Sequence, residues 1–370
     1  MSQAEGPTLP SDFAAAVTHL GAATLGMLQA FELLQRRLHP PVIPELRGAL
    51  EPLRERLAAA LEEARGIPAP TALASFHAQL CEAAGRAAEA GRFFCEEGSP
   101  DGAAARVLQS LSEACRAQAA LYPLRVVLPP VARFFAEPPL AECATALDPV
   151  AGEGASVGLQ VAQGPDGERG GFHLYVPERY RGDAAWPLVV ALHGAMGSGA
   201  DFLWTWLREA RSRRFLLLAP TSRDTTWSMQ GADRDGSALR GMVRFVSERW
   251  NVDASRVLLT GLSDGGTFAL LCGLGEESPF TALACVSGVL HPANLSNGNL
   301  ERARGRRIYV AHGALDWLFP PALARLSVET LRGAGAEVIH HEIENLSHTY
   351  PREENDAILR WLDPALVPAP

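Results

Sequence analysis

Hydrophobic positions follow two different periods along the chain, one in each half. From Ser11 to about Tyr122, apolar residues recur every three or four positions, which predicts amphipathic helices. Beyond about Ala155, short runs rich in β-branched residues alternate with helical stretches, a pattern typical of a mostly parallel sheet with helices on both faces. The change of period predicts an all-α region followed by an α/β region.

The first half is expected to form four helices separated by short breaks rich in proline and glycine. The first apolar stripe begins at Phe13 and stops at Pro40, and the other helices are expected at residues 44–64, 71–94 and 100–121. Short connections between long amphipathic helices favour antiparallel neighbours, so we expect a four-helix-bundle-like domain. We place this helical bundle domain at residues 1–124, a linker rich in proline and glycine at 125–154, and an α/β domain at 155–370.

Eight short runs in the second half are predicted to be strands of one sheet. The first two flank an Asp166-Gly167 pair, which favours an antiparallel hairpin at one edge. Ligands of open α/β sheets bind at the carboxyl ends of the strands, so the loops after the strands are where chemistry is expected. The eight runs are 156–163, 171–177, 187–194, 214–220, 256–261, 282–288, 307–313 and 336–343.

One serine lies in a G-x-S-x-G pattern, Gly261–Gly265, between a predicted strand and a predicted helix. Such a corner holds its serine in a strained conformation and leaves no room for Cβ atoms two residues before and after it. A neutral hydroxyl also needs a base and a group that orients the base, and in this arrangement they follow in the order Ser, Asp or Glu, His. We therefore predict Ser263 as nucleophile, Asp316 as acid and His348 as base, because the last two follow predicted strands.

Other titratable residues fit these roles less well. His312 ends a predicted strand and is expected to order the loop of the acid. His340 and His341 lie within the last predicted strand and are expected to be packing or surface residues. Glu342 and Glu344 lie in or just past that strand, which is too early in the chain for the acid position. Histidines of the helical half are expected to be surface residues: His19, His39 and His77.

Acyl transfer also needs donors for the negative charge that develops on the carbonyl oxygen, and each fixed N–H group contributes roughly 3 kcal/mol. The N–H of Asp264, which follows the serine, is one predicted donor. The loop His193–Gly197, with the pattern H-G-x-x-G, is expected to supply the second, and His193 is expected to brace this loop.

Large side chains near the predicted strand ends are candidates to line the substrate pocket, since apolar residues commonly shape such pockets. We predict this role for Trp317, Trp227 and Met196. Phe202, Trp204 and Trp206 follow the H-G-x-x-G loop, but the two tryptophans cannot share one face of a helix, so at least one is expected to be a packing residue.

The motifs "LHGAMGS", "GLSDGG", "HGALDWLFP" and "LSHTYP" resemble those of α/β-hydrolases, over about residues 156–363. The similar groups are phospholipase/carboxylesterases, dienelactone hydrolases and esterases of the polyhydroxybutyrate-depolymerase or feruloyl-esterase type. The resemblance implies an eight-stranded core, a Ser-Asp-His triad and hydrolysis of carboxylic esters without a cofactor. By the same match, Ala195 and Asp264 are expected to supply the N–H groups of the oxyanion hole. The helical half has no counterpart there; we expect it either to cover the pocket or to mediate dimerisation. Residues 288–307, after the sixth strand, leave no room for a lid.

The formal charge of −9 opposes a nucleic-acid or anionic-membrane partner. No secretory signal and no membrane-spanning run of about 18 apolar residues is evident, so we expect a cytoplasmic protein. The six cysteines are widely spaced, which favours buried thiols over a metal site.

The leading hypothesis is a serine esterase that acts on a small-molecule ester without metal or cofactor. The alternatives are a thioesterase or peptidase with the same triad, or a scaffold that binds through its helices.

Overall fold

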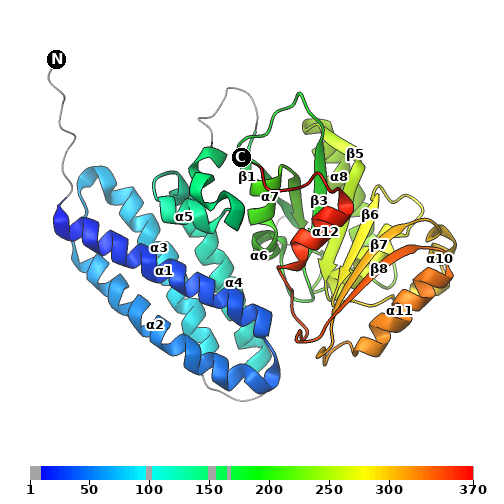
Figure 1. Ribbon diagram of the computed structural model, residues 1–370, viewed down its shortest axis with the longest axis horizontal. Helices are drawn as coiled ribbons and strands as arrows, with labels where there is room; N and C mark the ends of the chain where they lie inside the picture. Colours follow the sequence, from blue (N-terminus) through cyan, green and yellow to red (C-terminus); the bar gives the residue numbers. More distant parts are fainter. Residues whose placement is uncertain (1–9, 97–101, 149–155, 165–167, 370) are drawn as a thin grey trace. The chain divides into compact units, whose positions relative to one another are not determined.

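Apolar stripes at helical spacing produce four long helices in the first half of the chain (Figure 1). They are α1 (Ser11–Arg37), α2 (Ile43–Gly66), α3 (Ala74–Cys95) and α4 (Ala103–Leu121). The structure is a computed structural model that describes residues 10–96, 102–148, 156–164 and 168–369. Within them the four predicted helices are confirmed, with boundaries that differ by a few residues.

The chain divides into two compact units. The helical unit is Met1–Leu34 with Pro40–Phe135, and the sheet unit is Gln35–His39 with Ala136–Pro370. In the helical unit, α3 lies next to both α2 and α4. Its buried face consists largely of small residues, among them Ala83, Ala87 and Ala90, which allow neighbouring helices to approach closely. A four-helix-bundle packing of the whole unit stays a prediction.

Helix α1 is long and apolar enough to cross a membrane, by length and composition alone. Core helices of soluble proteins and signal sequences meet the same two criteria, so a single helix of this kind is weak evidence for a membrane span. Its buried positions, from Phe13 through Leu20 and Met27 to Leu34, follow the helical spacing of a packed stripe. An amphipathic core helix accounts for this pattern.

The predicted linker at 125–154 contains short helices where it is described. These are η4 (Tyr122–Val126), α5 (Pro129–Phe134) and η5 (Pro138–Leu147). Proline occupies one of the first two positions of each helix, where its missing N–H costs nothing, so prolines that suggested breaks instead begin helices. The boundary between the two compact units lies inside this stretch, after Phe135. Residues 149–155 lie outside the described part of the chain.

All eight predicted strands are present and form one sheet in the order β1-β2-β4-β3-β5-β6-β7-β8. The two strands at one edge, β1 and β2, run antiparallel to each other, β2 is antiparallel to β4, and the pairs from β4 onward are parallel. The predicted edge hairpin is therefore confirmed, although its Asp166-Gly167 turn lies outside the described residues. The strands are β1 (Gly158–Gln163), β2 (Gly171–Val176), β3 (Trp186–Leu192), β4 (Leu216–Pro220), β5 (Val252–Leu262), β6 (Ala282–Val286), β7 (Arg307–Gly313) and β8 (Glu337–Ile343).

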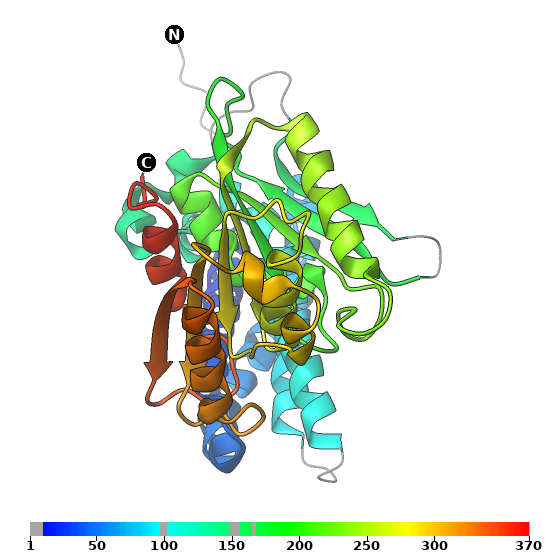
Figure 2. The ribbon, with the colours of Figure 1, turned by 90° about the vertical axis from the view of Figure 1, so that its right-hand side faces the viewer.

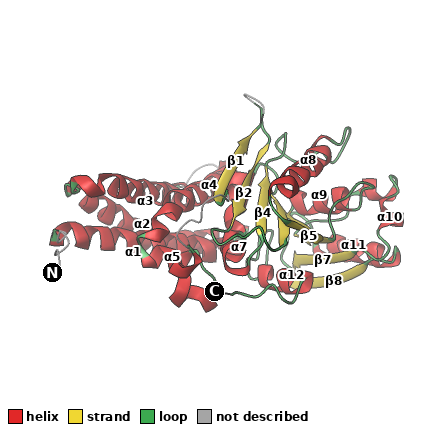
Figure 3. Cartoon of the chain, turned by 90° about the horizontal axis from the view of Figure 1, so that it is seen from above, coloured by secondary structure: helices red, strands yellow, loops and turns green. Residues whose placement is uncertain are grey.

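Helices cover both faces of the sheet, because successive residues of the inner strands point to opposite faces and both sets are apolar. On β7, Ile308 and Val310 join the core beneath α8 (Arg234–Arg249), α9 (Asp264–Gly273) and α11 (Pro321–Gly333). Tyr309, which lies between Ile308 and Val310 in the strand, points to the opposite face and contacts Trp361 and Glu354 of α12 (Glu354–Leu362). Figure 2 looks onto the face covered by α8 and α11, and Figure 3 shows α7 (Leu207–Arg213) and α12 on the other face.

Short helices complete the loops of the sheet unit. The segment after β6 contains only η7 (Pro292–Leu295) and α10 (Asn299–Arg302) and is too short for a helical lid, as its sequence indicates. After β3, α6 (Gly199–Phe202) and η6 (Leu203–Thr205) lead into α7. The carboxyl ends of β3, β5, β7 and β8 therefore carry short loops, and the predicted site residues lie on them.

Candidate active site

Ser263 occupies a sharp corner between β5 and α9. Its backbone has φ 56° and ψ −120°, a conformation that non-glycine residues rarely adopt. Both glycines of the pattern are required: a Cβ atom on Gly261 would overlap the backbone of Gly265, and one on Gly265 would overlap the carbonyl oxygen of His193. The corner therefore holds the serine in a strained turn at the amino end of a helix, as the sequence predicts.

A continuous chain of hydrogen bonds joins the three predicted residues. His348 Nε2 lies 2.9 Å from Ser263 Oγ, and His348 Nδ1 lies 2.8 Å from Asp316 Oδ2. A carboxylate only accepts, so His348 Nδ1 carries the proton and Nε2 is free to accept from the serine hydroxyl. The ring therefore bridges hydroxyl and carboxylate in the tautomer that a general base requires.

The carboxylate of Asp316 is fully buried as a side chain, so its charge has to be stabilised by nearby donors. Its Oδ1 accepts the backbone N–H groups of Leu318 (3.0 Å) and Phe319 (2.8 Å). Its Oδ2 faces His348 and lies 3.4 Å from His312 Nε2. These contacts fix the direction in which the carboxylate meets the imidazole.

His312 supports the loop that contains Asp316, as expected from its place at the end of β7. Its ring is completely buried, and Nε2 donates to the carbonyl oxygen of Phe319 at 2.8 Å. This bond closes the turn Gly313–Phe319, which contains Asp316. His312 is therefore a support for the acid and does not contact the serine.

The loops that carry acid and base lie together because β7 and β8 are parallel neighbours. Ala314 N donates to Ile343 O, and Leu315 N donates to Leu346 O, both at 2.9 Å. Parallel strands end at the same edge of a sheet, so residues 32 positions apart meet without a long connection.

The H-G-x-x-G loop after β3 packs directly against the serine corner. A Cβ atom on Gly194 would lie 3.5 Å from both Ser263 Cβ and the carbonyl oxygen of Leu262. His193 braces this loop: Nδ1 donates to Gly194 O at 2.7 Å, and Nε2 accepts Ser222 N at 3.0 Å. Burial lowers the pKa of His193 to about 4, so the ring is neutral near pH 7, as a bracing role requires.

Comparison with known proteins agrees with this geometry. Residues 231–365 match the family described as "Phospholipase/Carboxylesterase". The chain is 28% identical over 210 residues to "Feruloyl esterase B" of Neurospora crassa, covering 51% of this chain and 68% of that protein. It is 25% identical over 142 residues to "Acetylxylan esterase A" of Emericella nidulans, covering 35% and 46%. The sheet unit has an α/β-hydrolase fold, and the relatives it matches are named as esterases.

A crystal structure of a thermostable esterase is 22% identical to the chain, with a TM-score of 0.46, and the overlap covers 55% of this chain and 61% of that one. The family match lies within the hydrolase unit, from the end of the β4–α8 loop to just beyond α12. It includes Ser263, Asp316 and His348.

Predicted pocket residues differ widely in exposure. Met196, with φ 62°, and Trp317 are 65% and 56% exposed and are free to contact a ligand. Trp227 is 2% exposed: its indole stacks on Phe268, and its Nε1 donates to His193 O at 2.8 Å, so it mainly holds the H-G-x-x-G loop. The aromatic residues after that loop are all buried and serve packing: Phe202, Trp204 and Trp206.

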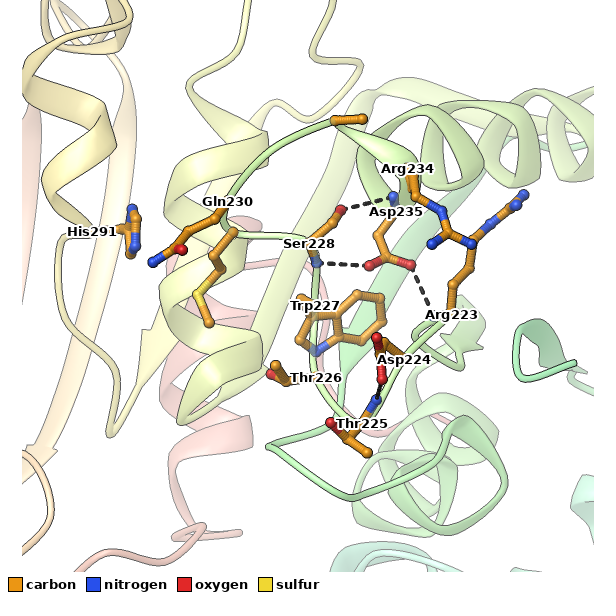
Figure 4. A pocket seen from close by; sticks show the side chains of 12 residues that line it. Arg223, Asp224, Thr225, Thr226, Trp227, Ser228, Gln230, Arg234, Asp235 and His291 are labelled. Carbon is orange, nitrogen blue, oxygen red and sulfur yellow. Dashed lines mark hydrogen bonds between the residues drawn. The ribbon is translucent and has the colours of Figure 1, made fainter.

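Beside the corner, the hydrolase unit has a pocket of about 440 Å³, formed by the β4–α8 loop and His291. Figure 4 shows Arg223 and Arg234 at one end and Gln230 and His291 at the other. Asp235, 3% exposed, holds the loop: its carboxylate accepts the N–H groups of Arg223 (3.0 Å) and Ser228 (2.7 Å).

Asp235 and Thr226 both line this pocket, and neither residue was predicted from the sequence. Thr226 Oγ1 donates to Asp264 Oδ2 at 2.6 Å, so the pocket wall is bonded to the residue after the nucleophile. One feature of the sequence could have drawn attention to this loop. Asp233 caps α8 by accepting Gly236 N, and Asp235 follows two residues later, so acidic residues cluster at the start of the helix.

Four further histidines have partners other than Ser263, and one of them corrects a prediction. His341 pairs with Glu354, His19 pairs with Glu63, and His77 Nε2 donates to Ala64 O. The prediction that His39 is a plain surface residue is wrong: it is half-buried and lies 2.9 Å from Ser347 Oγ, next to His348. A contact across 308 positions leaves no trace in local sequence periodicity.

Cysteines and metal-binding groups contribute nothing to this site. The six cysteines are free thiols, of which Cys285 is buried, and burial raises its pKa to about 12, so it is an unreactive packing residue. Within the described residues, no cluster of three or more His, Cys, Asp or Glu side chains could hold a metal ion.

Proposed function

We propose that this protein hydrolyses carboxylic esters through an acyl-enzyme intermediate, with Ser263 as nucleophile, His348 as general base and acid, and Asp316 as the group that orients the imidazole. The observation that carries the proposal is the unbroken hydrogen-bond chain from Ser263 Oγ through His348 to Asp316, at 2.9 and 2.8 Å. The strained backbone of Ser263 supports it, because such strain persists where it serves a function.

In the first half of the reaction, His348 Nε2 takes the proton of Ser263 as Oγ attacks the ester carbonyl carbon. The resulting tetrahedral intermediate collapses when the C–O bond to the alcohol breaks, and His348 returns the proton to the departing oxygen. In the second half, His348 takes a proton from water, which attacks the acyl-enzyme and releases the carboxylic acid. Asp316 stays ionised and stabilises the imidazolium in both halves.

Two backbone amides are proposed to bind the oxyanion. Asp264 begins α9, so its N–H has no partner within the helix and lies at the positive end of the helix dipole. In the H-G-x-x-G loop, Met196 N donates to Thr225 O at 2.6 Å and Gly197 N to Gly194 O at 3.1 Å. Ala195 N makes no backbone hydrogen bond within the described residues, which makes it the donor of this loop for the oxyanion.

We propose that one part of the ester occupies the pocket beside the corner. Its wall combines apolar and polar surface, and Thr226, Gln230 and His291 are able to bond hydroxyl groups. Two relatives are named "Feruloyl esterase B" and "Acetylxylan esterase A". We propose a small or aromatic acyl group on a hydroxyl-bearing alcohol as the substrate class.

The test is the Ser263→Ala variant assayed on p-nitrophenyl acetate, with the wild type and Ser237→Ala as controls. Ser237 is an exposed serine of α8 that bonds only Arg240 among the described residues. We expect Ser263→Ala to lose at least about 10³-fold in kcat while its circular dichroism spectrum is unchanged, since removal of a triad member leaves only binding and oxyanion stabilisation.

Labelling by a fluorophosphonate, which reacts only with an activated serine, gives a second readout. We expect the wild type and Ser237→Ala to be labelled and Ser263→Ala to remain unlabelled. Retained turnover in Ser263→Ala, or label on another residue, contradicts the assignment. A panel of matched acetate esters, thioesters and anilides then separates an esterase from a thioesterase or a peptidase with the same triad.

A further inference from the structure

A short segment from the beginning of the chain belongs to the hydrolase unit. Residues Gln35–His39, which include the last turn of α1, form one compact unit with the sheet, although the preceding residues of that helix do not. The segment bonds the loop Asn345–Thr349, which carries His348. Nothing in the motifs of the active site requires this segment, so its contacts call for a separate explanation.

The segment contacts the residues on both sides of His348. His39 Nδ1 lies 2.9 Å from the hydroxyl of Ser347, and the hydroxyl of Thr349 donates to the carbonyl oxygen of Gln35 at 2.8 Å. Ser347 and Thr349 are only 2% and 4% exposed, so water cannot readily replace these partners. The two bonds therefore fix the backbone immediately before and immediately after the imidazole.

Ser347 extends the contact to the loop of the acid. Its hydroxyl donates to the carbonyl oxygen of Leu315 at 3.3 Å, and because a hydroxyl has one proton, His39 Nδ1 must be the donor to Ser347. Leu315 directly precedes Asp316. One histidine outside the triad is thus bonded, through a single serine, to the loops of both Asp316 and His348.

A third contact anchors the base of the same loop. Arg36 Nη2 donates to Asn345 Oδ1 at 2.7 Å, and Arg36 also forms an ion pair with Glu353. These partners are more exposed than Ser347 and Thr349, so this pair contributes less to the position of His348.

We infer that Gln35–His39 is a positioning segment for His348, with His39 and the Gln35 carbonyl holding the two neighbours of the base. The inference rests on the proposed function. Proton transfer requires the base to stay within hydrogen-bond reach of Ser263 Oγ, and a displacement of about 1 Å can cost on the order of 10²-fold in rate. The segment keeps the loop at that distance without touching the substrate.

The experiment compares point variants in the full chain. His39→Ala removes the donor to Ser347, and Thr349→Val removes the hydroxyl while keeping the shape. We expect either change to lower kcat on p-nitrophenyl acetate roughly 10- to 100-fold, with KM within about twofold and the rate of fluorophosphonate labelling reduced in parallel with kcat. A side chain with only a structural role would lower the amount of folded protein and leave kcat per labelled site unchanged.

Conservative replacements and matched controls complete the design. His39→Asn, which keeps a donor near the position of Nδ1, and Thr349→Ser are expected to recover most of the lost kcat. His19→Ala and Thr330→Val are the controls, because His19 pairs only with Glu63 among the described residues and the hydroxyl of the partly exposed Thr330 bonds within its own helix. Both should retain wild-type kcat.

The outcomes separate this inference from the proposed function. If Ser263→Ala is inactive while His39→Ala and Thr349→Val both keep kcat within twofold of the wild type, the positioning role is wrong and the triad stands. The positioning role is also wrong if Thr349→Ser loses as much kcat as Thr349→Val. If Ser263→Ala keeps wild-type turnover, both the function and the positioning role are overturned.

Discussion

The two compact units bury different kinds of side chain. The helical unit has a core mainly of leucine, alanine and phenylalanine; it buries the carboxylate of Glu113, while pairs such as Arg92–Glu89 lie on its surface. The hydrolase unit has an equally apolar core but also buries charged groups, including Arg213, Asp235 and Asp316. Burying a charge costs free energy unless each partner is in place, so such groups occur where they hold a loop or a reacting group in position. Among the described residues, buried charge is therefore more frequent in the hydrolase unit than in the helical unit.

The largest expected difference between the units concerns a buried ion pair. In the hydrolase unit, Arg213 Nε donates to Glu137 Oε2 at 2.7 Å, and the same guanidinium bonds Asp356 and the carbonyl oxygen of Leu366. Glu137→Gln leaves the buried guanidinium with one carboxylate fewer. We expect a loss of about 3–5 kcal/mol in the free energy of unfolding, because the remaining charge stays buried without its main partner.

Urea denaturation followed by far-ultraviolet circular dichroism, which reports the helices of both units, measures this loss. Glu89→Gln in the helical unit is the matched control, since it breaks a pair whose side chains are about half exposed, and it should leave the denaturation midpoint unchanged. If Glu137→Gln and Glu89→Gln lowered the denaturation midpoint equally, the buried ion pair would contribute no more to stability than the exposed one.

The sequence was sufficient to predict the elements whose signals are local. Helical spacing from Phe13 to Leu34, eight apolar runs and the Gly261–Gly265 corner each specify their structure over a few residues. The hydrogen-bonded group of Ser263, His348 and Asp316 could be anticipated because parallel strands end at one edge, which brings the loops after β7 and β8 to the corner after β5. Each of these signals is independent of distant parts of the chain.

The features that were missed depend on contacts between distant residues. His39 meets Ser347 across 308 positions, and Glu137 meets Arg213 inside a region predicted to be a linker. The prolines of that region suggested breaks, whereas in the structure they occupy the first turns of short helices. Trp227 lines the pocket beside the corner, but its stacking on Phe268, which buries most of the indole, was not predicted. Tertiary packing decided each case.

Acid should weaken the hydrolase unit, because burial lowers the pKa values of His193, His173 and His340, all in that unit. For His193 the pKa falls from about 6.5 to about 4. Between these values the unfolded chain binds a proton that the folded unit does not, so the stability present above pH 6.5 is lost as pH falls toward 4. His193 alone should reduce the free energy of unfolding by about 2 kcal/mol between pH 7 and pH 5.

Hydrogen exchange at these two pH values, corrected for the intrinsic exchange rate, reports the two units separately. Amides of β3 and β5 should lose protection at pH 5 relative to amides of α3. In His193→Gln, which cannot titrate, the difference for β3 and β5 should shrink even though the variant is less stable at pH 7. An unchanged pH dependence in that variant would exclude His193 as a source of the acid sensitivity.

The smallest expected effect concerns glycine, and here the two units should differ in sign. In the helical unit, Gly48 lies inside α2, and a Cβ atom on it would meet nothing within 4 Å. Gly48→Ala should therefore stabilise α2 by about 0.4–1 kcal/mol, since alanine loses less backbone entropy on folding. In the hydrolase unit, Gly265→Ala should destabilise, because its Cβ atom would overlap His193 O at the serine corner.

Hydrogen exchange and ester turnover of Gly48→Ala test the prediction for the helical unit. The α2 amides should exchange more slowly than in the wild type while turnover is unchanged. A loss of turnover in Gly48→Ala would mean that α2 contributes to the active site.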